Sequence, residues 1–166
     1  MSGGPSIAAI DVVIIVVANL YNLGMAVIFL SRLLGLKRLE RGLGLALVAL
    51  VIPLAAGVYL NFFQGRGLWA VLLPACLADF LLVELLLDYI LRLGFRRTPL
   101  LIPYLLLYYL GLIAMIGYSF AVDKELGFFT LGTYFINLWA TWYSHRQGGR
   151  IESRRRHIWL SLRRQI

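Results

Sequence analysis

Charged residues are scarce in this sequence. Only 14% of its 166 residues are Asp, Glu, Lys or Arg, whereas 61% are hydrophobic. Soluble domains have about 25% charged and about 45–50% apolar residues. The chain therefore has too few polar side chains to cover a water-soluble globule, and we expect an integral membrane protein.

Cysteine and histidine are also scarce. The one cysteine, Cys76, excludes an internal disulfide, and two histidines, His145 and His157, are too few for the usual zinc or di-iron sites. The sequence contains no Gly-rich phosphate loop, no nucleophile elbow and no HExxH motif. We expect no metal site and no cofactor, and these patterns argue against an enzyme.

Long apolar runs dominate what is present. A helix needs about 20 apolar residues to cross the hydrocarbon layer, and short connections make successive helices antiparallel. The first run has no positively charged region before it and is too long for a signal-peptide core, so we interpret it as a span. The sequence predicts an all-α, polytopic membrane bundle within residues 1–145, with five transmembrane helices near 7–31, 43–63, 68–91, 100–122 and 126–144.

Basic residues alternate between the connections. Fourteen Lys and Arg residues lie in or beside the first and third connections and in the tail, whereas the second and fourth contain only Arg66 and Lys124. Cytoplasmic loops carry the excess of basic residues in membrane proteins. The pattern predicts a plasma-membrane protein with an outside N-terminus and a cytoplasmic tail, residues 146–166.

Three acids interrupt the third predicted span. Asp79 lies near its middle, with Glu84 and Asp88 closer to the cytoplasm. An acid at the bilayer centre costs about 2.5–3.5 kcal/mol and usually faces the bundle interior. We therefore select Asp79 and Glu84 as proton- or ion-binding candidates. Asp88 precedes Arg92 by four residues, which predicts a salt bridge at the membrane interface.

No basic residue lies at the depth of Asp79 or Glu84. A buried acid without a counter-charge takes a proton, binds a cation or pairs with a base from another chain. Polar residues at similar depths predict a layer that Asp79 can join, although each alone is typical of helix-packing hydrogen bonds. These residues are Asn19, Asn22, Tyr108, Tyr109, Tyr134 and Asn137.

Two further positions carry specific expectations. Asp11, at the start of the first span, is expected to be hydrated at the outer interface or to belong to the helix start. Pro53 lies near the middle of the second span with Gly57 four residues later, which predicts a kink there.

The C-terminal tail forms a basic amphipathic segment when it is drawn as a helix. Such a segment typically lies on a membrane surface and binds anionic headgroups, with an equally weighted alternative of a topology anchor made of solvated arginines. Nucleic-acid binding is not favoured because no base-stacking module accompanies the arginines. The predicted lipid contacts are Arg154, Arg155, Arg156, Trp159, Arg163 and Arg164.

Three functions are compatible with these features. The first is a small carrier, channel or coupling-ion subunit that binds protons or cations at Asp79 and Glu84. The second is a non-catalytic subunit of a membrane complex, as a homo-oligomer or with another membrane protein. The third, least favoured, is an enzyme of lipid or isoprenoid phosphates, with Mg²⁺ held by cytoplasmic-side carboxylates.

Overall fold

The computed structural model describes residues 8–92 and 98–163, with side chains described as far as Gln147. Every regular element in these residues is helical, which confirms the all-α prediction. The elements are α1 (Ala9–Leu33), α2 (Lys37–Val48), α3 (Val51–Phe63), α4 (Leu68–Glu84), the π-helical η1 (Leu85–Ile90), α5 (Leu101–Val122) and α6 (Lys124–Arg163).

Four helical stretches of the described chain are long and apolar enough to cross a membrane. They are Ala9–Leu33, Lys37–Phe63, Leu68–Ile90 and Leu101–Val122, and they correspond to the first four predicted spans. The chain is therefore an all-helical bundle of the membrane-protein type. The fifth predicted span lies within α6, which is long enough but carries more polar residues than the other four helices.

The helices pack as a closed ring in chain order, because α6 packs back against α1. Helix α1 packs against α2, α3 and α6 and also touches α5, and α5 lies between α4 and α6. We call the end at which α1 begins the first end of the bundle; it also holds the α3–α4 and α5–α6 turns. The opposite, second end holds the α1–α2 turn.

Turn residues explain several helix ends. Gly35 and Gly65 have φ of 72° and 64°, in the left-handed region that glycine adopts without steric cost, and they lie in the α1–α2 and α3–α4 turns. Asp123 caps α6, because its Oδ1 accepts hydrogen bonds from the backbone N–H groups of Glu125 (2.8 Å) and Leu126 (3.2 Å).

The kink in the second predicted span lies earlier than its sequence suggests. The helix is interrupted between α2 and α3, at Ala49 and Leu50, rather than at Pro53 or Gly57. Proline has no N–H for the carbonyl four residues before it, and its ring clashes with that carbonyl, which belongs to Ala49. The disruption therefore appears one turn before the proline.

Large apolar side chains fill the middle of the ring. Ile14, Leu54, Leu77 and Phe80 are completely buried, and Gly57 lets α3 approach the side chain of Ile14 on α1. Many other apolar side chains are exposed on the outside of the bundle, as on a helical surface that faces lipid.

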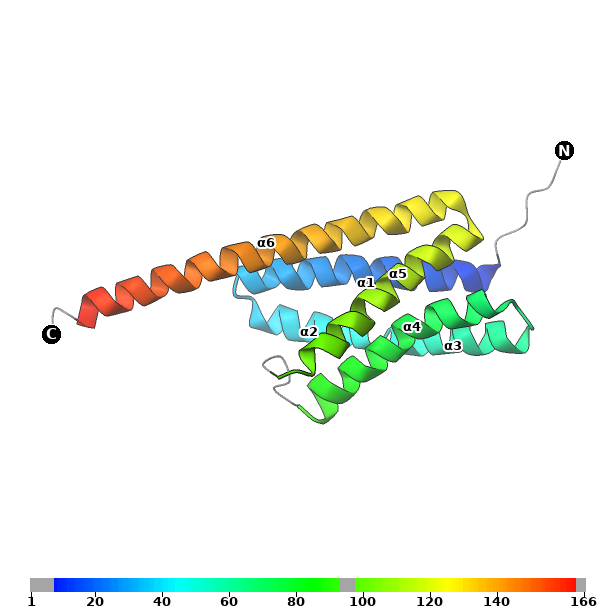
Figure 1. Cartoon of the computed structure of the whole chain (residues 1–166), viewed down its shortest axis with the longest axis horizontal. Helices are drawn as coiled ribbons and strands as arrows, with labels where there is room; N and C mark the ends of the chain where they lie inside the picture. The colour runs from blue at the N-terminus through cyan, green and yellow to red at the C-terminus, as the bar shows by residue number, and fades with distance from the viewer. Residues whose placement is uncertain (1–7, 93–97, 164–166) are drawn as a thin grey trace.

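Helix α6 continues well past the bundle. It runs without a break to Arg163, and its C-terminal half projects beyond the second end (Figure 1). The predicted tail therefore begins inside a helix rather than after one. The side chains of Arg154, Arg155, Arg156, Trp159 and Arg163, together with all of Arg164, lie outside the described residues, so the predicted lipid contacts stay predictions.

Candidate functional site

Asp79 faces away from the bundle. It lies eleven residues from either end of the apolar stretch Leu68–Ile90, so its position at the middle of the helix agrees with the prediction from the sequence. Its side chain, however, is exposed on an outer stripe of the helix with Leu72, Leu82 and Leu86. The expectation that Asp79 faces the interior is wrong, and it does not join the polar layer.

The packing of α4 against α5 explains this direction. Leu77, two residues before Asp79, is fully buried, and its Cα lies 3.1 Å from the position that a Cβ on Gly111 of α5 would occupy. Residues two apart on an α-helix point about 200° apart. Close contact between α5 and the Cys76–Leu77 backbone therefore turns Asp79 outward.

Glu84 lies on a different side of the same helix. It is half-buried and close enough to Tyr21 of α1 and Tyr108 of α5 for its charge to act on both hydroxyl groups. Tyr104 also acts on Tyr21, and Asn137 of α6 donates a 2.9 Å hydrogen bond to the Tyr108 hydroxyl. We call Tyr21, Glu84, Tyr104, Tyr108 and Asn137 the Glu84 cluster.

The remaining predicted polar residues form a second buried group between α1, α5 and α6. Asn19 donates to Thr130 (3.1 Å) and accepts from Thr133 (2.7 Å), and Asn22 donates to Thr133 (3.2 Å). Thr130 in turn donates to Ser119 of α5 (2.9 Å). We call Asn19, Asn22, Ser119, Thr130 and Thr133 the polar seam.

Two predicted tyrosines lie at the edge of the Glu84 cluster. Tyr109 and Tyr134 are half-buried, and both lie close enough to Tyr108 to interact with it electrostatically. The predicted layer is therefore divided into the polar seam and the Glu84 cluster, which meet along α6 where Thr133 and Asn137 are one turn apart.

The predicted salt bridge between Asp88 and Arg92 stays a prediction. Between described residues, salt bridges join Arg32 to Glu40 and Asp11 to Arg66. Asp88 lies in the π-helical turn η1, and Arg92 follows the end of that turn with φ of 49°. The two residues are therefore not four apart on a regular α-helix, the geometry on which the prediction was based.

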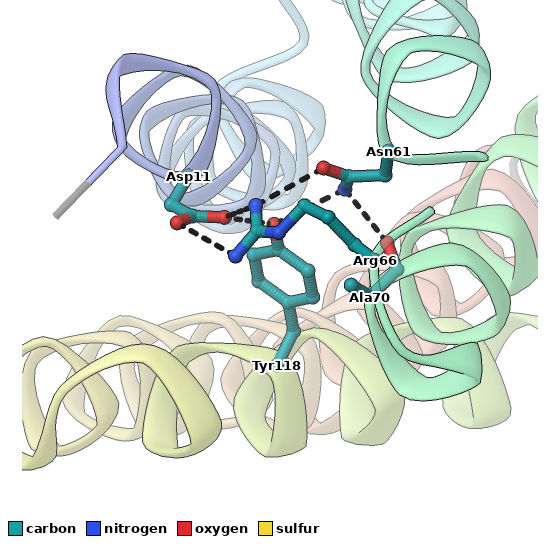
Figure 2. A network of polar contacts seen from close by, with 5 residues as sticks. All are labelled: Asp11, Asn61, Arg66, Ala70 and Tyr118. Atoms are coloured by element: carbon teal, nitrogen blue, oxygen red, sulfur yellow. Dashed lines mark hydrogen bonds and ion pairs between the residues drawn. The ribbon is translucent and has the colours of Figure 1, made fainter. Parts of the chain in front are cut away.

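A buried ion pair is made by Asp11 at the first end of the bundle (Figure 2). The Arg66 guanidinium donates to both carboxylate oxygens of Asp11, at 2.5 and 3.1 Å, and Tyr118 donates to the same carboxylate at 2.6 Å. Asn61 accepts from Arg66 (3.0 Å) and donates to the carbonyl of Ala70 (2.7 Å). We call Asp11, Asn61, Arg66 and Tyr118 the Asp11 network.

Asp11 is only 3% exposed, so the expectation of a hydrated carboxylate is wrong. The alternative expectation, that Asp11 belongs to the start of a helix, is correct. The sequence did not show that the α3–α4 turn brings Arg66 to this carboxylate. The hydrogen bond with Asp11 raises the pKa of the Arg66 guanidinium, a group that is protonated at physiological pH even without this shift. The network joins α1, α3, α5 and the α3–α4 turn through one satisfied ion pair.

A surface groove of about 260 Å³ lies between α1 and α6. Its lining is apolar apart from Asn19, and neither Asp79 nor Glu84 borders it. It offers no charged group to a polar solute.

Sequence reasoning passed over several of the residues that form these contacts. The sequence does contain a pattern that identifies Thr130 and Thr133. Together with Asn137 and Ser144 they are spaced by three, four and seven residues, which places all four on one face of a helix. All four are buried. Asn61 and Tyr118 have no such signal, because their partners come from distant parts of the chain.

No known protein family model matches the chain, and no curated protein and no solved structure is significantly similar to it. The class is therefore defined by the structure alone: an all-helical bundle with four helices able to span a membrane, a buried ion pair at one end and an outward-facing acid at mid-helix.

Proposed function

We propose that this protein is a subunit of a larger membrane assembly and that α4 binds a transmembrane helix of a partner protein. That helix carries a Lys or Arg side chain at the depth of Asp79. The observation behind the proposal is the exposure of Asp79 at the centre of an apolar helix, among the exposed leucines Leu72, Leu82 and Leu86.

The proposal follows from the cost of that position. An acid exposed to lipid at the bilayer centre costs about 2.5–3.5 kcal/mol on insertion scales, and acids within membranes are usually paired or in contact with water. Within the described chain Asp79 makes no salt bridge. A basic side chain from a neighbouring helix would neutralise the carboxylate and cover the stripe.

Charge favours a different protein over a second copy of this chain. The basic residues whose side chains are described lie in turns, near helix ends or, in the case of Arg146, 22 residues after the start of α6, and all are far from the depth of Asp79. Among the described residues, a second copy therefore brings no basic side chain to the bilayer centre. These residues are Arg32, Lys37, Arg38, Arg41, Arg66, Arg92, Lys124 and Arg146.

The proposal treats α6 as a fifth span. Its polar residues lower its average hydrophobicity, but Thr130, Thr133 and Asn137 are buried against the bundle. Its outer face exposes large apolar side chains such as Phe129 and Trp139. This distribution, polar inside and apolar outside, suits a helix in lipid. Together with the alternating basic loops, it supports an orientation with the first end outside and the α6 extension in the cytoplasm.

The test uses a synthetic single-span helix of leucine and alanine with one central lysine. Its association with the full-length protein in lipid vesicles is measured by energy transfer between labels on the helix and on the protein's C-terminus. We expect the lysine helix to bind at least about ten-fold more tightly than the same helix with a central leucine, which corresponds to about 1.4 kcal/mol.

Asp79→Asn keeps the side-chain shape but removes the charge, and it should abolish this preference. Leu82→Ala alters the same stripe without changing charge and should preserve it. Equal binding of the two helices, or a preference that survives Asp79→Asn, would refute the proposal. Self-association that depends on Asp79 would also refute it, because the occupant of the stripe would then be a second copy.

A further inference from the structure

Three buried polar atoms near the Glu84 cluster have no hydrogen-bond partner among the described side chains and backbone. They are the hydroxyl of Tyr21 and the side-chain oxygens of Asn22 and Asn137. All three residues are at most 2% exposed. Leaving such a group unsatisfied costs about 1–3 kcal/mol, so a partner is expected.

The three atoms belong to one region of the bundle. Asn137 is bonded to Tyr108, and the ring of Tyr21 packs edge-on against the ring of Tyr108 with 6.5 Å between their centres. Asn22 is bonded to Thr133, which lies one helical turn before Asn137 on α6. The region is therefore bounded by α1, α5 and α6, where the polar seam meets the Glu84 cluster.

The chemistry of these atoms identifies the ligand class. Two are amide oxygens that only accept hydrogen bonds, and the third is a hydroxyl that both donates and accepts. A divalent cation needs six or more oxygen ligands, often several of them charged, which this set does not supply. Buried water typically makes about three hydrogen bonds to polar groups of this kind.

We infer that this region is an internal hydration site, in which Tyr21, Asn22 and Asn137 bind water between the polar seam and Glu84. Glu84 is close enough to Tyr21 to interact with its hydroxyl electrostatically, so the site lies on the side of the bundle that faces Glu84. The site joins two groups of polar residues that the direct hydrogen bonds leave separate. It is independent of the outward stripe on α4 and of any partner there.

The first test is made on the unmodified protein in detergent micelles. Nuclear magnetic resonance cross-peaks between water and the side-chain amide protons of Asn22 and Asn137 should be present despite their burial. Asn19 is the internal control: its amide donates to Ile15 and Thr130 and its oxygen accepts from Thr133, so it should show no water cross-peak. Absence of water signals at both Asn22 and Asn137 would overturn the inference.

The second test measures whether Tyr21→Phe raises or lowers the Tm of the protein. If water bonds to the Tyr21 hydroxyl, Tyr21→Phe removes a made hydrogen bond and lowers Tm. If the hydroxyl has no partner, removing it relieves an unsatisfied group, and Tm stays the same or rises. Tyr118→Phe, which loses the bond to Asp11, should lower Tm, whereas the exposed Tyr59→Phe should not change it. An unchanged or higher Tm for Tyr21→Phe would contradict the inference.

Discussion

Asp11 and Asp79 are both carboxylates in apolar helices, but their surroundings are opposite. Asp11 lies near a helix end and is enclosed by an arginine, a tyrosine and other helices. Asp79 lies at mid-helix and is exposed on the outside of the bundle. The position of an acid along a helix therefore does not decide whether it is buried. Burial depends on the direction of its side chain and on whether a partner side chain is long enough to contact it.

The two sites also differ in how their charge is compensated. The Asp11 carboxylate is neutralised within the chain, which makes it a structural link between helices at the first end. The Asp79 carboxylate is not paired with a described basic residue, which makes it a candidate for contact with another molecule. Three substitutions test this contrast.

The largest expected effect is that of Arg66→Met. It leaves the buried Asp11 carboxylate without its cation, and breaking a buried pair in this way typically costs about 3–5 kcal/mol. Asp11→Asn should cost less, because the Arg66 side chain is 24% exposed and can reach water. The free energy of unfolding in mixed micelles measures both, with Lys124→Met as an exposed control at the same end. A larger loss for Asp11→Asn would show that Arg66, rather than Asp11, is the partner that is more costly to leave unpaired. Wild-type stability for Arg66→Met would show that the ion pair does not stabilise the fold.

A smaller effect is expected for Gly111→Val, which tests why Asp79 faces outward. A side chain at Gly111 meets the backbone of Leu77 and Cys76, so overpacking should cost about 1–3 kcal/mol and disturb the rotation of α4. Gly117→Val is the matched control on α5, because the nearest atom to its Cβ is the end of the Leu73 side chain at 3.8 Å. Equal unfolding free energies for the two variants would mean that the close α4–α5 contact does not set the direction of Asp79.

The smallest effect is expected for Glu40→Gln, which removes the second described ion pair. Arg32 and Glu40 are 2.7 Å apart but remain 40% and 30% exposed, and such surface pairs contribute about 0.2–1 kcal/mol. Added salt should reduce this difference, whereas the effect of Arg66→Met should persist because burial protects its pair from screening. A loss from Glu40→Gln as large as that from Arg66→Met would remove the distinction between buried and exposed pairs.

Much of the architecture was predictable because it depends on local composition. Four apolar stretches, their connections and the depth of Asp79 follow from counting residues at a fixed rise per residue. The sequence predicted a helix break near Pro53, but the break lies one turn earlier. The reason is that proline removes the hydrogen bond to the carbonyl four residues before it. The spacing of the polar residues on α6 shows that they share one helix face. No comparable pattern in the sequence shows which residues of α1 they contact.

By itself, the amino-acid sequence determined the four long apolar stretches, their approximate lengths, the alternation of basic residues between their connections and the scarcity of charge inside them. Those features depend on hydrophobicity and backbone geometry, which act within a few turns. Only the tertiary structure decided which acid is buried, since Arg66 reaches Asp11 across 55 positions of the chain and Gly111 turns α4 through contact with Leu77. Side-chain direction depends on helix rotation, and rotation is set by packing between segments that are distant in the chain.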